Sequence, residues 1–436
     1  MAEKINYRFI HFGCWNNINK KNEKTLGNLE GVMDTLKNFI KNPQSEDVIK
    51  PELIIVAGDN YYPEKATKTT EATEATEATE ATEATEKSAK SAKKEKKEKI
   101  KVINIYLEKL KQGFDKLPKG IEIKMILGNH DLDTSGAKKK LFIKEEANTI
   151  KEKEKVEGDC LILTTEMAKV KEIAENAEKI TLHMFDEKLV LDDTLILMID
   201  TSMYTSDAEK FLPCYNKIQE TSQDTKEIDA LIYDQTQNIA DTIDKYIKKE
   251  NTLKNIIIVG HHPIIELKNK GGLKISNEIS TKIRPVLKTI RDKINNENVK
   301  YFYLCADLHL YQQGEIKIDL SETASETASE MTINQYIVGT GGTELDDEII
   351  ITEPNPTYKS DDEKITYKVN ECKHAYGFLD CILTKGAPPI FNFISATEVI
   401  KGGGGNRKHQ KTLRRQKTLK HKRRSGTKVK KNIKTM

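Results

Sequence analysis

The chain has 436 residues, of which 37% are hydrophobic and 32% are charged, and its formal net charge is +3. This length holds one large α/β domain or two ordinary ones, and the composition predicts a soluble globular protein. No apolar run reaches the length that crosses a bilayer, which excludes a protein with membrane-spanning helices.

The N-terminus leads directly into a predicted strand and lacks the layout of a signal peptide. The cysteines are scattered and form no Cys-x-x-Cys pair. We therefore expect reduced thiols and an intracellular location, cytoplasmic or nuclear. The six cysteines are Cys14, Cys160, Cys214, Cys305, Cys372 and Cys381.

The first fifty residues predict a strand, a loop around Cys14 and a helix. From Leu26 to Ile40 apolar residues recur at helical spacing, which favours a core-facing helix over a binding surface. A second strand, Leu53–Ala57, ends on the sequence Gly58-Asp59-Asn60-Tyr61-Tyr62. Gly-Asp pairs also form ordinary turns, so this motif alone leaves both interpretations open.

Three segments have the composition of insertions. Residues 64–99 repeat Glu-Ala-Thr and then become Lys-rich, residues 136–179 are rich in Lys and Glu, and residues 321–330 read SETASETASE. With almost no apolar side chains, 64–99 cannot offset the entropy of ordering, which predicts a solvated loop or frayed helix. Helical segments are expected within 136–179, and 321–330 is expected at the tip of a hairpin.

The third strand carries the densest group of polar side chains. Apolar residues alternate from Ile121 to Leu127, and the sequence Gly128-Asn129-His130-Asp131 follows at once. In open α/β sheets, ligands bind outside the carboxyl ends of the strands. An amide, an imidazole and a carboxylate at such a position indicate a metal or catalytic site, with a polar turn as the alternative.

A hairpin is expected in Ile180–Thr201, where we interpret Asp200 as a residue at the strand end rather than a ligand. An amphipathic helix, Ile228–Lys249, leads to the strand Asn255–Val259, which ends on Gly260-His261-His262-Pro263. Adjacent histidines are often only a packed or solvated pair, so this motif is also ambiguous by itself.

A further helix over Ile275–Ile294 leads to an aromatic-rich strand, Lys300–Cys305, which is followed by Asp307 and His309. The loop Gly339–Gly342 has no helix after it, so we interpret it as a turn between strands rather than a phosphate-binding loop. Closing strands are expected before residue 400.

A glycine run, Gly402–Gly405, predicts a flexible joint between a folded domain, 1–400, and a basic tail within 401–436. Fourteen of the 71 Lys and Arg residues lie in 406–436, which has no acidic residue, so the remainder carries 57 basic against 68 acidic residues. Such a tail suits sequence-independent contact with nucleic acid, an anionic surface or an import receptor. A disordered solubilising tail is the alternative.

Four predicted strand ends thus carry oxygen or imidazole donors, and their combination favours a shared cation site over four independent turns. This ordered set resembles the calcineurin-like metallophosphoesterases, and within them the purple acid phosphatase branch, over roughly 7–383. Blocks 58–62, 128–131 and 260–263 match the family pattern, and 306–309 matches it in part. The first block would lie in 9–17, with Cys14 where the family has aspartate.

The resemblance implies a four-layer α/β/β/α sandwich of two mixed sheets. It also implies hydrolysis of phosphate esters, phosphomonoesters in the first place, by a hydroxide that bridges two metal ions (Fe, Zn or Mn). A phosphorylated small molecule or a phosphoprotein would be the substrate.

The residues expected to hold the metals each follow a predicted strand. Asp59 would bridge the two ions, with Tyr62 on the first ion, where a phenolate suits ferric iron. The full set of expected ligands is Cys14, Asp59, Tyr62, Asn129, His261, Asp307 and His309.

For catalysis, the resemblance makes His130 the group that orients the phosphate and donates a proton to the leaving oxygen. Asp131 would hold His130 in place. The expected substrate-binding residues are Asn129, His130 and His262.

Two residues depart from the family pattern. Cys14 replaces a hard carboxylate with a softer thiolate, which suits zinc better than ferric iron. Asp307 replaces an imidazole and adds negative charge. Two alternatives stay open: a catalytically weakened interaction scaffold of the same fold, and a nuclease or phosphodiesterase tethered by the basic tail. Tyr62 favours the phosphatase branch.

Overall fold

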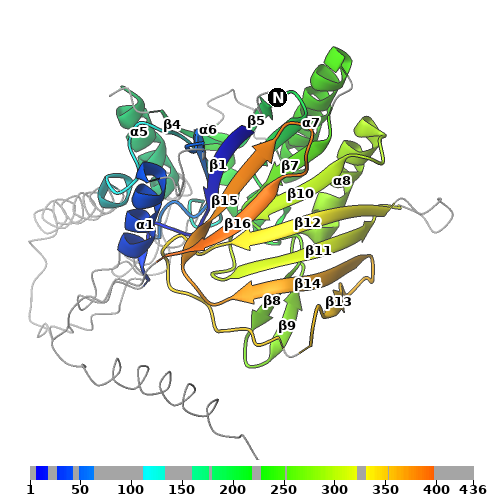
Figure 1. The fold of residues 1–436 in the computed structure, drawn as a ribbon. Helices are drawn as coiled ribbons and strands as arrows, with labels where there is room; N and C mark the ends of the chain where they lie inside the picture. The colour runs from blue at the N-terminus through cyan, green and yellow to red at the C-terminus, as the bar shows by residue number, and fades with distance from the viewer. Residues whose placement is uncertain are drawn as a thin grey trace, which may run out of the picture. The chain divides into compact units, whose positions relative to one another are not determined.

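The computed structural model describes residues 6–17, 27–42, 49–62, 111–132, 160–175, 179–218, 227–250, 253–321, 330–351 and 353–396. These described residues belong to one compact unit, Met1–Glu398 (Figure 1). The insertion 64–99, most of 136–179, the repeat at 322–329 and the tail 401–436 lie outside them, so those predictions stay predictions.

The first sheet has six strands in the order β16-β15-β1-β2-β3-β4. β1, β2, β3 and β4 run parallel, whereas β15 pairs antiparallel with both β1 and β16. In sheet order the strands are Ile390–Ser395, Gly377–Thr384, Asn6–Phe12, Leu53–Ala57, Glu122–Ile126 and Ile180–His183.

The second sheet has eight strands in the order β13-β14-β11-β12-β10-β7-β6-β5. β6, β7, β10 and β12 form its parallel centre, and the strands on both sides of this centre pair antiparallel. In sheet order the strands are Thr357–Lys359, Ile365–Lys373, Tyr311–Asp319, Glu330–Val338, Lys300–Cys305, Asn255–Val259, Thr194–Ile199 and Phe185–Val190.

The described helices are few. They are α1 (Leu29–Lys41), α5 (Leu161–Glu175), the short 3-10 helix η2 (Ser202–Tyr204), α6 (Ala208–Ile218), α7 (Ile228–Glu250) and α8 (Ser280–Ile294). None of them is long and apolar enough to span a bilayer.

A small hairpin follows β7 and corrects one prediction. β8 (Glu266–Asn269) pairs with β9 (Leu273–Ser276), and the two positive-φ glycines Gly271 and Gly272 turn the chain between them. The helix expected from Ile275 therefore begins only at Ser280, because the preceding residues are taken up by strand pairing.

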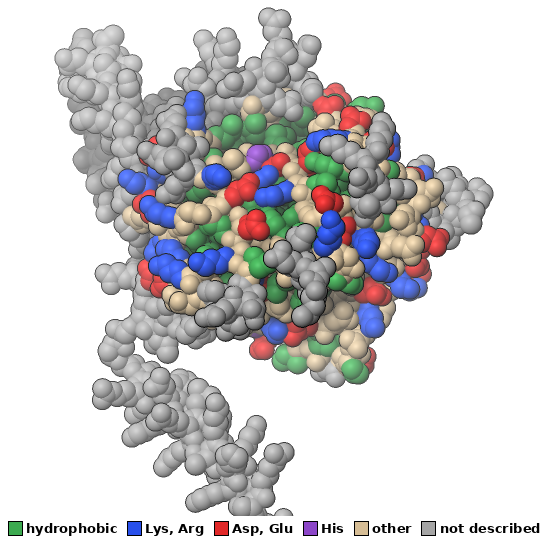
Figure 2. Space-filling view, turned by 45° about the horizontal axis from the view of Figure 1, so that its top comes forward, with side chains coloured by type: hydrophobic (Ala, Val, Ile, Leu, Met, Phe, Trp, Pro, Cys, Tyr) green, Lys and Arg blue, Asp and Glu red, His purple; other side chains and the backbone are tan. Residues whose placement is uncertain are grey.

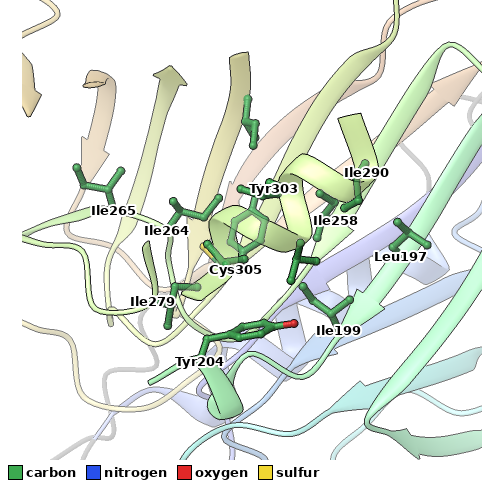
Figure 3. Packing of buried hydrophobic residues seen from close by; sticks show 14 of the residues in the cluster. Leu197, Ile199, Tyr204, Ile258, Ile264, Ile265, Ile279, Ile290, Tyr303 and Cys305 are labelled. Carbon is green, nitrogen blue, oxygen red and sulfur yellow. The ribbon is translucent and has the colours of Figure 1, made fainter. Parts of the chain in front are cut away.

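The core has two parts because side chains of the central strands alternate between the faces of the second sheet. Ile257 and Val259 of β7 pack toward the first sheet, among side chains such as Ile54. Ile256 and Ile258 pack in a cluster with residues of α7 and α8. Figure 3 shows this second cluster, with Ile258 beside side chains from β6, β10 and α8. The predicted fold of two mixed sheets with helices outside is confirmed.

The cysteine prediction is wrong for two of the six residues. Cys160, directly before α5, and Cys214 in α6 form a disulfide across a sequence separation of 54. Cys14, Cys305, Cys372 and Cys381 are free thiols. Absence of a Cys-x-x-Cys pair did not exclude a disulfide, because a pairing between helices leaves no local spacing signal.

Lys and Arg side chains are interspersed with Asp and Glu side chains on the face shown in Figure 2. The electrostatic fields of these positive and negative side chains therefore largely cancel on that face.

Candidate metal centre

The predicted donor residues come together at the carboxyl ends of parallel strands from both sheets. β1, β2 and β3 of the first sheet and β7 and β10 of the second each end directly before one of the motifs. Backbone hydrogen bonds join these loops within and across the motifs: the amide of Cys14 donates to the Gly58 carbonyl (3.2 Å), and the amide of Ala306 donates to the His261 carbonyl (2.8 Å).

Three candidate ligands have left-handed backbone conformations: Cys14 (φ 53°), Asp59 (φ 53°) and Asp307 (φ 56°). Such a conformation costs a non-glycine residue about 1–3 kcal/mol, and it persists only where the surrounding structure enforces it. The repeated strain at one site is typical of functional loops.

Glycine is required where the loops meet. A Cβ at Gly128 would lie 2.4 Å from the Asp59 amide nitrogen and from its Oδ1. A Cβ at Gly58 would lie 2.7 Å from the Gly128 nitrogen and from His261 Nδ1. The two glycines therefore permit the close approach of the Asp59, Asn129 and His261 loops.

Asp59 is buried at the centre of the site, and its two oxygens face different groups of residues. Oδ2 accepts a hydrogen bond from the Tyr62 hydroxyl (2.7 Å) and lies 3.8 Å from Cys14 Sγ. Oδ1 lies 3.2 Å from His261 Nε2 and accepts a hydrogen bond from the His130 amide (3.1 Å). Burial raises the pKa of Asp59, but His261 and His130 outweigh it, so the pKa lies well below its usual range.

His261 has its tautomer set by the backbone. Its Nδ1 lies 2.6 Å from the Ala57 carbonyl oxygen, which can only accept, so Nδ1 carries the proton. In the neutral ring Nε2 then presents a lone pair to Asn129 Oδ1 (3.0 Å) and Asp59 Oδ1 (3.2 Å). Three hydrogen-bond acceptors thus lie close together with no proton between them. A bound cation, or a second proton on Nε2, removes the repulsion between them. The opposing effects of burial and Asp59 give the metal-free ring a pKa raised to about 9.

A second group of donors lies on the other side of Asp59. The Tyr62 hydroxyl lies 3.2 Å from His309 Nε2, and the rings of the two residues meet edge to face. Burial, together with the charge of Asp59, raises the pKa of both the Cys14 thiol and the Tyr62 phenol. Both groups therefore hold their protons in the metal-free chain.

The Cys14 loop is held from outside by the loop Gly339–Gly342. The amide of Gly341 donates to the Gly13 carbonyl (3.0 Å), and the amide of Thr343 donates to the Cys14 carbonyl (3.1 Å). These contacts agree with the interpretation of this glycine-rich loop as a turn rather than a phosphate cradle.

Asp307 lies on the His261 side. Its Oδ1 is 3.9 Å from His261 Nε2, and its Oδ2 is 3.7 Å from Lys268 Nζ. Burial raises the pKa of this carboxyl, but His262, His261 and Lys268 together hold it below its usual range.

The expected role of Asp131 is corrected by its contacts. Its Oδ1 accepts a hydrogen bond from the Asn60 amide (2.8 Å), and its Oδ2 accepts from Asn60 Nδ2 (3.0 Å) and from the Gly128 amide (2.8 Å). Asp131 thus fastens two motif loops together instead of holding the His130 ring, which lies tilted by 45° against the Tyr62 ring with a centroid distance of 4.6 Å. Burial and Asp59 raise the pKa of Asp131 to about 7.

Thr201, at the end of β6, supports both adjacent histidines and was not singled out in the sequence. Its Oγ1 accepts hydrogen bonds from the amides of His261 (3.0 Å) and His262 (2.9 Å) and lies 3.0 Å from His262 Nδ1. With both lone pairs engaged, the hydroxyl proton is directed to His262 Nδ1, which leaves the proton of the neutral ring on Nε2. The only sequence signal was a polar residue directly after a buried strand.

Asp200, next to Thr201, is buried and stabilises the turn that follows β6. Its carboxylate accepts hydrogen bonds from the Ser202 amide (2.8 Å) and the Tyr215 hydroxyl (2.9 Å). This role agrees with its interpretation as a strand-end residue.

Among the residues that the structure describes, two overlapping sets of side chains have ligand atoms within 4.8 Å of one another: Cys14, Asp59 and His261, and His261, His262 and Asp307. They combine thiol, carboxylate and imidazole donors, which fits transition-metal ions better than magnesium or calcium.

Buried and partly buried donors at the strand ends of two mixed sheets thus form a candidate metal site in a mixed α/β protein. A sequence model of the calcineurin-like phosphoesterase family (Metallophos) matches residues 7–311, and the chain belongs to this family. Phosphoesterases are enzymes that hydrolyse phosphoesters.

Two solved structures show similarity at low sequence identity. The purple acid phosphatase PPD1 from yellow lupin (Lupinus luteus) seeds is 10% identical with a TM-score of 0.42; the match covers 90% of this chain and 52% of the lupin chain. A PhoD structure is 11% identical, also with a TM-score of 0.42, and the match covers 97% of this chain and 78% of PhoD. The chain thus spans about half the length of the lupin enzyme. No curated protein sequence matches this chain.

Proposed function

We propose that this chain hydrolyses phosphate esters, preferentially phosphomonoesters of a small molecule or a phosphoprotein, at a centre of two metal ions. One observation carries the proposal: the two oxygens of the buried Asp59 face two separate groups of donors. A carboxylate placed in this way is suited to bridge two cations.

Cys14, Tyr62 and His309 would hold the first ion together with Asp59. Asn129, His261 and Asp307 would hold the second. The bound ions would neutralise charge on the phosphoryl oxygens and activate a water as nucleophile. Iron, zinc and manganese are the candidates, and the Cys14 thiolate favours zinc in the first position over ferric iron.

His130 is the proposed proton donor to the leaving oxygen. Its backbone amide is fixed on Asp59 (3.1 Å) and its ring lies beside Tyr62, so the side chain remains at the edge of the donor set. Asn129 and His262, whose neutral ring carries its proton on Nε2, would supply further contacts to a phosphate. Asp131 would act by holding the Asn60 and Gly128 backbones in register.

The test compares hydrolysis of a chromogenic phosphomonoester and the matching diester by protein loaded with Zn²⁺, Mn²⁺ or iron. We expect about two metal ions per chain and faster turnover of the monoester. His130→Ala should lower kcat by about 10²-fold or more while both ions stay bound.

Tyr233→Ala, at a site 67% exposed on α7, is the matched control and should behave as wild type. Turnover that survives both His130→Ala and Asp59→Ala would refute the proposal. Metal-replete protein without bound metal and without turnover would favour the scaffold alternative.

A further inference from the structure

The β8–β9 hairpin places a lysine beside the proposed second metal position. Lys268 Nζ lies 2.5 Å from Glu266 Oε1 and 3.7 Å from Asp307 Oδ2, and the lysine side chain is 23% exposed. The chain thus has a cation against the residue that departs from the family pattern on this side of the site.

The position of this lysine is fixed by the backbone under it. Gln312 of β11 bonds both backbone groups of Leu267: the Leu267 amide donates to Gln312 Oε1 (3.0 Å), and Gln312 Nε2 donates to the Leu267 carbonyl (3.2 Å). Glu266 is buried and holds the ammonium from the other side. The ammonium is therefore kept on the outer side of Asp307.

The two oxygens of Asp307 consequently have different neighbours. Oδ2 faces Lys268, whereas Oδ1 faces His261 Nε2 at 3.9 Å. The ammonium of Lys268 lies between two carboxyl groups, those of Glu266 and Asp307, so it keeps Glu266 as a partner whichever residue stands at position 307.

We propose that Lys268 is a positioning residue that makes Asp307 an acceptable replacement for an imidazole at the second metal position. It binds the outer oxygen and thereby turns the inner oxygen toward the metal position. This inference rests on the proposed two-metal centre. Lys268 and Asp307 should therefore act as a unit, and removing Lys268 should weaken the second ion only while Asp307 is present.

The test is a double-mutant cycle on affinity for the second ion. Wild type, Lys268→Met, Asp307→His and the double variant are stripped of metal and titrated with Zn²⁺, with stoichiometry checked by elemental analysis. In wild type, Lys268→Met should weaken the second ion at least about tenfold, because the inner oxygen of Asp307 is no longer held toward the metal position. In the Asp307→His background, which has no carboxylate to position, Lys268→Met should change this affinity by less than about threefold.

Lys268→Arg, which keeps the charge, and Lys274→Met, on the other strand of the hairpin, should both match wild type within about threefold. Thermal unfolding of the metal-free variants checks that each folds. If Lys268→Met has the same effect in both backgrounds, Lys268 is not the partner of Asp307. Wild type that binds only one ion refutes the two-metal centre and this inference together, whereas two ions with additive variants refute only the inference.

Discussion

The two donor groups around Asp59 differ in how ready they are to receive a metal. On the Oδ1 side, Nδ1 of His261 donates to the Ala57 carbonyl, and the pKa of the ring is raised to about 9, so one proton must leave Nε2 before this residue can bind an ion. On the Oδ2 side, burial keeps protons on Cys14 and Tyr62, and both must be lost before these groups can bind an ion as thiolate and phenolate. The second position thus releases one proton when it binds an ion and the first position releases two, so uptake of the first ion should depend more steeply on pH.

Asp59→Asn should give the largest effect, because it removes the charge that both groups share. We expect loss of both ions and a fall in kcat/KM of at least about 10³-fold. Elemental analysis and phosphomonoester turnover measure the two effects. If the variant retains one ion, the bridging role assigned to Asp59 is wrong.

Thr201→Val tests the supported side alone. The substitution leaves two buried amides, those of His261 and His262, without their acceptor, which should lower the free energy of unfolding by about 2–3 kcal/mol. Affinity for the second ion should fall while affinity for the first stays within a few-fold. Thr201→Ser, which keeps the hydroxyl, is the matched control, and equal weakening of both ions would show that the two sides are not independent.

Cys14→Asp tests the side of Cys14 and Tyr62. A carboxyl group loses its proton at much lower pH than a buried thiol, so first-ion uptake should begin at a pH lower by about one unit or more. Metal stoichiometry measured from pH 5 to pH 9 follows this shift. Cys14→Ser, which offers no ionisable group in that range, should weaken the first ion at every pH, and an unchanged pH profile in Cys14→Asp would contradict the explanation.

The substitution His11→Gln should give the smallest effect. It separates the pH dependence of folding stability from the pH dependence of metal uptake. His11 is fully buried on β1, its Nε2 lies 3.3 Å from the Cys305 carbonyl, and burial lowers its pKa to about 4. In the unfolded chain this histidine has a pKa of about 6.5, so below that pH the unfolded chain binds a proton that the folded chain does not bind. The free energy of unfolding should therefore fall by about 1 kcal/mol per pH unit as the pH is lowered from about 6.5 toward 4. Urea unfolding of metal-free wild type and His11→Gln between pH 6.5 and 4.5 measures it. Equal slopes in the two proteins would show that another group controls acid stability.

The strand-end motifs were predictable because each is local: a buried run, a glycine, and polar residues directly behind it. The parallel sheet then brings distant motifs together by a general rule of α/β folds. The site residues Asp59, Asn129 and His261 needed nothing beyond this pattern to be recognised as candidates.

The supporting residues were not predictable in the same way. Thr201 and Lys268 are ordinary in their local sequence, and only the pairing of β6 with β7 and the turn of the β8–β9 hairpin give them their roles. The Cys160–Cys214 disulfide likewise depends on how two helices pack. Asp131 was expected to hold the His130 ring, and its hydrogen bonds to Asn60 and Gly128 required coordinates.

The closing of the first sheet by β15 has a consequence for biosynthesis. Arg8 on β1 forms a buried ion pair with Asp380 on β15 (2.6 Å), 372 residues later in the chain. A nascent chain leaving the ribosome therefore exposes one edge of β1 while the 372 residues that separate Arg8 from Asp380 are made, roughly 20–75 s at ordinary elongation rates. The Cys14 loop extends from that same strand, so the strand that carries this proposed ligand is paired on both edges only after β15 has emerged.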